Sequence, residues 1–186
     1  IDEVSISNGE LYTVVTNKSF CGKKGCLVAI VQGTKLEDVS SALLKISKKR
    51  RKTVKTITRD MAETMTKICS LCFPLAIQID DRFHVQKLVS EALQEVRIAI
   101  RKEVIKEHNE KTAEARKRGG NYWPDRFENG DNKKELLARS RHLLYKPKGR
   151  WTKSQKQRAK ILFREYPLLK KAYSLSMQFR GVYEHA

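Results

Sequence analysis

The sequence predicts an α/β protein in which one small mixed sheet is followed by helices only. Three observations support this prediction. The first third of the 186 residues contains strand-like runs separated by turns, two further strand-like runs alternate with helical repeats, and none follows them. Three antiparallel strands followed by two strand–helix crossovers build a five-stranded mixed sheet with helices on its faces. The expected order is β-β-β-α-β-α-β, followed by an all-helical insertion.

The first three strands are expected at residues 4–7, 11–16 and 26–31. The first run alternates, the second is rich in β-branched and aromatic residues, and the third is nearly continuous in apolar residues. Asn8-Gly9 and the glycine-flanked segment 22–25 supply the turns between them. These runs therefore predict an antiparallel meander.

Helices and strands then alternate along the chain. Apolar residues return at helical spacing over residues 36–49, residues 53–58 alternate as a strand does, a second helix begins near Met61, and residues 75–79 form the fifth strand. A long helix is expected at residues 83–118, where apolar residues form one stripe and the last turns are mostly charged.

A turn-rich segment at residues 119–132 interrupts the helices, and its glycines and proline predict a hinge. Further helices are expected at residues 134–145, after the capping box of Thr152 and Gln155, and after Pro167. The whole order is typical of a ribonuclease-H-like fold. We therefore expect part of a ribonuclease-H-like core at residues 1–82 and the helical insertion at residues 83–186.

The charge of the chain indicates a polyanionic partner. Lys and Arg number 39 against 21 Asp and Glu, which leaves a formal charge of +18. Residues 45–59 hold eight basic residues and no acid, and residues 133–180 hold fifteen against two acids. Such an imbalance favours phosphate contact over an ordinary solvated face. The expected DNA-binding residues are Lys48, Lys49, Arg50, Arg51, Lys52, Lys148, Arg150, Lys153, Lys156 and Arg158.

Aromatic residues lie within or beside these basic stretches. Trp151, or Trp123 with Tyr122 in the hinge, has the chemistry to stack on unpaired bases. The alternative for each of them is a hydrophobic anchor in the core.

Membrane spans and zinc sites find little support. The longest nearly unbroken apolar stretch is interrupted by Pro74 and is far shorter than a membrane span. Cys69 and Cys72 fall in phase with the apolar face of a helix, which predicts core packing rather than zinc binding. Cys21 and Cys26 flank a turn, where a disulfide and two free thiols both remain open. Without a secretory leader we expect reduced thiols and a cytoplasmic location.

Two aspartates are candidates for chemistry. In the expected sheet the first and fourth strands are neighbours, so Asp2 and Asp60 face each other across one strand spacing. Carboxylates held this close repel each other, and shared divalent cations such as Mg²⁺ relieve that repulsion. Two such metals activate an attacking oxygen and stabilise the leaving one in phosphodiester cleavage. The alternative for Asp60 is a helix N-cap.

The D-R-F-H-V sequence at residues 81–85 changes the balance between these alternatives. In this box the chain resembles bacterial insertion-sequence transposases of the DDE class. The resemblance extends to the I-D-E opening at residues 1–3, the T-I-T-R-D-M box at residues 56–61, and residues 91–97, which continue the helix after the D-R-F-H-V box. The chain is similar to the group with a D-R-F-H-V box and a helical insertion. The resemblance covers most of the chain.

The resemblance implies that Asp2 and Asp60 are the first two catalytic carboxylates and ligands of a two-metal Mg²⁺ or Mn²⁺ site. It also implies that Asp81 and His84 line the edge of the active site, although a helix cap and a buried histidine remain alternatives. The implied partner is DNA, as transposon ends and target, with a homo-oligomer as the active complex.

One departure concerns the third carboxylate. Similar transposases carry it as a Glu in an N-G-x-x-E box beyond the insertion, and no Glu follows Asn129-Gly130 at that spacing. Glu95, 35 positions after Asp60, is an alternative third carboxylate, and an exposed charge on a helix is the other interpretation. Because the chain opens on Ile1 and lacks that box, we expect a trimmed fragment that binds duplex DNA with little sequence preference but does not cut it.

Three functional classes stay open on the sequence alone. The first is a DDE transposase that cleaves and transfers strands, and the second is a nuclease of the same fold that only hydrolyses. The third is a basic, non-catalytic DNA-binding module. The long helical segment disfavours a minimal ribonuclease H, and paired aspartates on adjacent strands disfavour the third class.

Overall fold

Residues 1–6, 9–20 and 22–183 are described in the structure of the chain, which is a computed structural model. Two compact units divide the chain, Ile1–Val85 and Gln86–Ala186. Ser7, Asn8 and Cys21 lie outside the described residues. The end of the first expected strand, the turn at Asn8-Gly9 and the relation of Cys21 to Cys26 therefore stay predictions.

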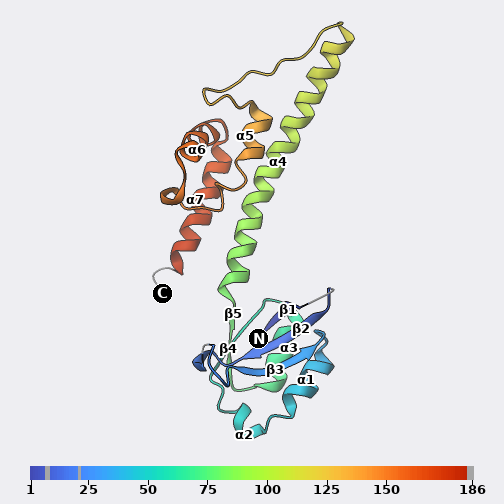
Figure 1. Cartoon of the computed structure of the whole chain (residues 1–186), viewed down its shortest axis with the longest axis vertical. Helices are drawn as coiled ribbons and strands as arrows, with labels where there is room; N and C mark the ends of the chain where they lie inside the picture. Colours follow the sequence, from blue (N-terminus) through green and yellow to red (C-terminus); the bar gives the residue numbers. More distant parts are fainter. Residues whose placement is uncertain (7–8, 21, 184–186) are drawn as a thin grey trace. The chain divides into compact units, whose positions relative to one another are not determined.

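Two small sheets form the first unit (Figure 1). β1 (Asp2–Ser5), β2 (Leu11–Thr16) and β3 (Leu27–Gln32) are antiparallel and lie in that order, as expected for a meander. β4 (Thr56–Arg59) and β5 (Ile77–Asp80) form a parallel pair. A mixed α/β architecture is thus confirmed.

The expected five-stranded sheet is not confirmed, because the strands pair as three plus two. The amino group of Ile1 donates a hydrogen bond of 2.8 Å to the carbonyl of Thr58, which brings the start of β1 beside the end of β4. In the described part of the chain this contact does not extend into a strand ladder between β1 and β4.

The helices of the first unit cover one face of the three-stranded sheet. α1 (Leu36–Leu44) packs on α3 (Glu63–Cys72), and both bury apolar residues against β2 and β3. The buried core of this unit consists of Val15, Val39, Leu43, Met65, Ile68, Cys72 and Phe73. Cys69 and Cys72 are buried free thiols, so their predicted role in the core is confirmed.

The single helix expected at residues 36–49 is interrupted. α1 ends at Leu44, and a short helix, α2 (Lys48–Arg51), follows after a turn. The Arg51 side chain holds this turn, because its Nε donates to the carbonyl of Ile46 at 3.0 Å. The turn also lets Ile46 pack against the core, so tertiary contacts override the helical pattern.

The second unit is helical, and most of α4 (Arg82–Lys117) belongs to it (Figure 1). α5 (Lys133–Arg139), α6 (Lys153–Glu165) and α7 (Pro167–Val182) follow, with a short 3₁₀ helix, η2 (Lys148–Arg150), before α6. Residues 118–132 form neither helix nor strand. The predicted capping box of Thr152 and Gln155 at the start of α6 is confirmed.

The core of the second unit is separate from that of the first. Its buried apolar residues are Leu93, Leu136, Leu137, Leu143, Leu144, Ala159, Ile161, Leu162, Leu169 and Tyr173. The helix expected at residues 134–145 ends at Arg139, and turns replace its second half. These turns bury the side chains of Leu143 and Leu144.

Among the described residues, α4 and the other helices lack the length of apolar sequence that spanning a membrane requires.

Candidate active site

An aspartate directly follows each of the two parallel strands of the first unit. Arg59 at the end of β4 pairs in register with Asp80 at the end of β5, so the next residues, Asp60 and Asp81, leave the sheet side by side. The carboxyl ends of parallel strands are the edge at which α/β sheets place ligands. The Asp81 amide donates to the carbonyl of Arg59 at 2.8 Å, which fixes the spacing of these two residues.

Asp2 joins them from the other sheet. The hydrogen bond between Ile1 and Thr58 sets Asp2, the first residue of β1, next to the end of β4. The Asp2 carboxylate accepts a hydrogen bond of 2.8 Å from the amide of Glu3 and is half exposed. The predicted pair of aspartates therefore approaches the same edge from two different sheets.

His84 lies between the two carboxylates. Asp81 caps α4 by accepting a hydrogen bond from the amide of Phe83 at 3.2 Å, and His84 follows in the first turn of that helix. Its Nδ1 lies 3.2 Å from an oxygen of Asp60, and its Nε2 lies 3.6 Å from an oxygen of Asp2. One imidazole ring thus contacts both aspartates that the sequence singles out.

The same ring belongs to a group of side chains with the spacing of metal ligands. Asp2, Asp81 and His84 each offer one ligand atom, and these atoms lie within 4.8 Å of one another. Asp60 reaches this group through the other nitrogen of His84. The side chains of Asp60 and His84 are each 23% exposed and that of Asp2 is 55% exposed, so the site is open to a large substrate.

Arg59 fixes the position of Asp60. Its guanidinium lies 2.9 Å from the carboxylate of Asp80, donates to Gln78 at 2.8 Å and donates to the backbone carbonyl of Asp60 at 3.0 Å. The Asp60 carboxylate also accepts a hydrogen bond of 2.5 Å from the amide of Met61. The guanidinium of Arg59 therefore bonds to residues in and beside β4 and β5, although Arg59 belongs to the basic stretch at residues 45–59.

Glu3 is a further acidic residue at this edge that sequence reasoning missed. Burial raises the pKa of its carboxyl, and the negative charges of Asp60 and Asp2 raise it further. Its side chain follows Asp2 and points to the opposite face of β1, as successive residues of a strand do. The sequence does show a second acid directly after Asp2. It was not considered for the site, because successive residues of a strand point to opposite faces.

A transposase family model, that of the ISL3-type DDE transposases, matches residues 1–186. The chain belongs to this transposase family. The resemblance drawn from the D-R-F-H-V box is therefore confirmed over the whole chain. No curated protein and no solved structure gives a significant match.

Glu95, the alternative third carboxylate within the chain, lies on the part of α4 that belongs to the second unit. Its side chain is exposed. The group of potential metal ligands found at the active-site edge does not include it. Its assignment stays a prediction.

The basic residues of the transposase fall into two kinds. Lys48, Lys49, Arg50 and Lys52 at α2 are exposed, as are Lys148, Arg150, Lys153 and Lys156 around the start of α6. Arg51 and Arg158 have structural partners instead. Arg51 also donates to the carbonyl of Cys72, and Arg158 donates to the buried carboxylate of Asp131 at 2.8 Å.

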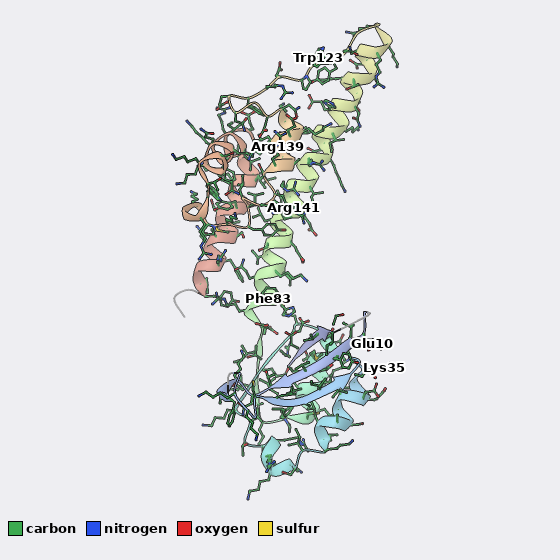
Figure 2. All side chains as sticks on the ribbon, in the orientation of Figure 1. Glu10, Lys35, Phe83, Trp123, Arg139 and Arg141 are labelled. Carbon is green, nitrogen blue, oxygen red and sulfur yellow. The ribbon has the colours of Figure 1, made fainter. Side chains whose placement is uncertain are left out.

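The two tryptophans of the transposase have opposite surroundings. Trp151 packs against Phe163 and Tyr173, with ring centroids 6.2 and 5.5 Å away, and its indole donates to the carbonyl of Leu143 at 2.8 Å. Trp123 is 82% exposed on the loop between α4 and α5 (Figure 2). The interpretation as a core anchor therefore fits Trp151, and stacking on bases remains open for Trp123.

Proposed function

We propose that this transposase cleaves phosphodiester bonds at transposon ends and transfers the strands, with Asp2 and Asp60 as catalytic carboxylates. The observation that supports the proposal is the convergence of both aspartates on the ring of His84. A non-catalytic DNA-binding module gains nothing from acids gathered at a sheet edge, because they repel the phosphates that it binds.

The donor set fits a divalent metal. Transposases of the DDE class use such ions, and carboxylate oxygens are the ligands that Mg²⁺ and Mn²⁺ prefer. Asp2, Asp81 and His84 would hold one ion, and Asp60 lies close enough to His84 to share in a two-metal site. A bound metal pair supplies charge stabilisation to the attacking and leaving oxygens of a phosphodiester.

The residues of the chain have distinct parts in this proposal. Arg59 and the Met61 amide hold Asp60 at a fixed place at the end of β4. His84 keeps the Asp2 and Asp60 carboxylates apart by contacting each with a different ring nitrogen. Such preorganisation lowers the cost of aligning the reacting groups, since the ligands need not be collected during the reaction.

DNA has to approach a site whose own side chains are acidic. The exposed lysines of α2, in the same unit, and those around the start of α6 supply the opposite charge. Each phosphate that they neutralise releases condensed counterions, which favours binding without reading sequence. We therefore propose that these lysines hold duplex DNA and that the aspartates act on it.

Metal binding by the chain tests the active-site assignment directly. Titration with Mn²⁺, followed by the electron paramagnetic resonance signal of the free ion, should show binding that weakens at least tenfold in Asp2→Asn, Asp60→Asn and Asp81→Asn. Asp38→Asn is the matched control, because Asp38 is exposed on α1 and loses the same charge. Equal affinity in all four variants would reject the site.

Strand chemistry separates a transposase from a hydrolytic nuclease. Joining of a labelled transposon end to a target plasmid by the transposase that contains residues 1–186 supports the proposal. Hydrolysis without joining supports a nuclease of the same fold. Loss of both reactions in Glu95→Gln, with Mn²⁺ binding reduced as well, would assign the third carboxylate to Glu95.

A further inference from the structure

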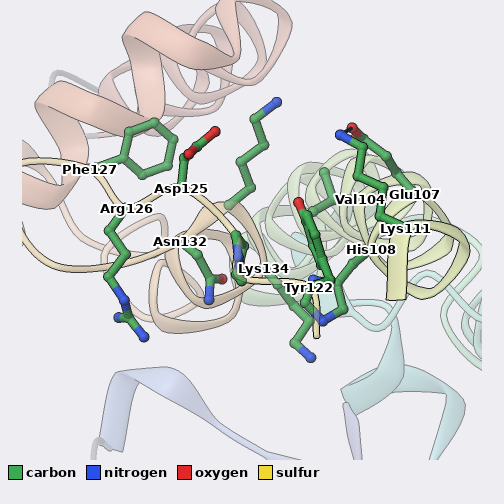
Figure 3. A pocket seen from close by; sticks show the side chains of 12 residues that line it. Val104, Glu107, His108, Lys111, Tyr122, Asp125, Arg126, Phe127, Asn132 and Lys134 are labelled. Atoms are coloured by element: carbon green, nitrogen blue, oxygen red, sulfur yellow. Dashed lines mark hydrogen bonds and ion pairs between the residues drawn. The ribbon is translucent and has the colours of Figure 1, made fainter. Parts of the chain in front are cut away.

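A pocket of about 250 Å³ lies in the second unit, between α4, the loop 118–132 and the start of α5 (Figure 3). Aromatic rings line part of it. His108 on α4 meets Tyr122 edge-on with ring centroids 5.4 Å apart, and Phe127 contributes a third ring. The volume is below the roughly 300–1,000 Å³ of pockets that enclose drug-sized ligands, so it suits one flat ring system.

Basic side chains surround these rings. Lys111, Arg126, Lys133 and Lys134 line the same pocket. Three acids oppose them: Glu107 pairs with Lys111 at 2.6 Å, Glu135 pairs with Arg126 at 3.4 Å, and Asp125 lies on the loop. Lys133 and Lys134 form no ion pair within 4.0 Å among the described residues. The pocket therefore combines aromatic faces with a surplus of positive charge.

Trp123 does not itself line this pocket, but its neighbours in the chain, Tyr122 and Pro124, do. Its 82% exposure is unusual, because tryptophan is on average one of the most buried residues. The core of the second unit does not use this side chain. An indole held out into solvent beside a basic aromatic pocket has the properties of a stacking platform for bases.

We propose that Trp123 and this pocket bind unpaired nucleotides of a DNA strand. The bases stack on Trp123 and enter the pocket beside Tyr122, and the phosphates lie near Lys133 and Lys134. Paired bases inside a duplex offer no free face to an indole, so the site selects unpaired DNA. The inference rests on the proposed function, because it assumes that DNA is the substrate. It adds that the second unit binds unpaired rather than duplex DNA.

The test compares single-stranded with duplex DNA. Fluorescence anisotropy of the chain with a labelled oligo-dT and with a labelled duplex of equal length gives two dissociation constants. Trp123→Ala should weaken binding of oligo-dT about tenfold or more, the loss that truncation of a base-stacking aromatic causes, and change duplex binding less than about twofold. Trp123→Phe should restore most of the affinity, because a ring remains.

Leu175→Ala is a matched control, since Leu175 is a 56% exposed apolar residue of the same unit outside this pocket. It should leave both constants unchanged. Oligo-dT should also quench the tryptophan fluorescence of the wild type and not that of Trp123→Ala, in which the core residue Trp151 remains.

The outcomes separate the two proposals. Equal loss of single-strand and duplex affinity in Trp123→Ala, or no loss of either, overturns the unpaired-nucleotide site while the proposed function stands. A wild-type chain that binds neither form of DNA overturns the DNA-binding part of the proposed function as well. Quenching that persists in Trp123→Ala also contradicts the site, because stacking would then occur elsewhere.

Discussion

The two units of this transposase use charge in opposite ways. The first unit gathers Asp2, Asp60 and Asp81 around His84, and it bears the cost of like charges held close together. The second unit carries 25 of the 39 basic residues and 12 of the 21 acidic ones, most of them spread over exposed helix faces. Concentrated acids suit metal-dependent chemistry, and dispersed bases suit contact with a phosphate backbone.

The largest expected effect belongs to the acidic site. Asp60→Asn should lower strand cleavage by the transposase about 10³-fold or more, because removing the charge removes metal stabilisation worth several kcal/mol. Duplex binding should stay within about twofold. The complementary change is Lys153→Ala with Lys156→Ala, which should weaken duplex binding and leave Mn²⁺ affinity intact. Cleavage and binding that fall together in Asp60→Asn would contradict the separation of the acidic site from the lysines that hold DNA.

The separate cores predict separate stabilities. Leu43→Ala should destabilise the first unit, and Leu162→Ala the second, each by about 2–5 kcal/mol, because both side chains are fully buried. Amide hydrogen exchange resolved by residue measures the two units in one experiment. Protection should fall only in the unit that carries the substitution. A loss of protection across both units would show that they unfold as one.

Asp131 gives a smaller effect with a definite pH dependence. Burial raises the pKa of this carboxyl, but hydrogen bonds from Arg158 and Arg139 outweigh burial and lower it below its ordinary value of 3.8. The charged form is therefore favoured in the folded state. Its contribution to stability is present in full above that ordinary value and is lost as the pH falls through the lowered one.

Asp131→Asn should accordingly cost about 2 kcal/mol near neutral pH, less than a fully buried pair because Arg139 is half exposed. Urea denaturation of wild type and variant at several pH values measures the difference. The two curves should converge below the native pKa of Asp131. A difference that is independent of pH would assign the loss to packing rather than to charge.

The smallest effects concern single lysines. Lys48→Ala and Lys52→Ala should each weaken duplex binding a few-fold and reduce the slope of log affinity against log salt by about 0.9 for each phosphate that is no longer neutralised. Thermal stability should not change, since both side chains are exposed. Arg51→Ala is the informative comparison. It should lower the melting temperature, because Arg51 holds the turn after α1.

Much of the local structure follows from the sequence alone. Apolar residues recur at helical spacing over residues 85–104 of α4, and the capping box of Thr152 and Gln155 marks the start of α6 without reference to any tertiary contact. The candidate site could also be predicted in part, since Asp60 and the D-R-F-H-V box directly follow two strands, β4 and β5. Patterns that depend on neighbours in the chain were therefore the predictable ones.

What escaped prediction depends on partners far away in the sequence. In the sequence Arg158 resembles an ordinary exposed basic residue. Only the structure shows that it binds the buried carboxylate of Asp131, which lies 27 positions earlier in the chain. Trp123 and Trp151 have similar basic surroundings in the sequence, yet one is exposed and the other packs in the core. The split of the sheet into three plus two strands had no local signal either, because β1 and β4 lie far apart in the chain.

The buried cysteines allow the opening of the first unit to be measured by chemical modification. All four cysteines of the chain precede residue 86, so thiol reagents can modify only this unit. Burial raises the pKa of the Cys69 and Cys72 thiols and keeps them protonated and shielded in the folded state. Alkylation of these two positions, followed by mass spectrometry, therefore measures how often the unit that holds the acidic site opens, whatever the helical unit is doing.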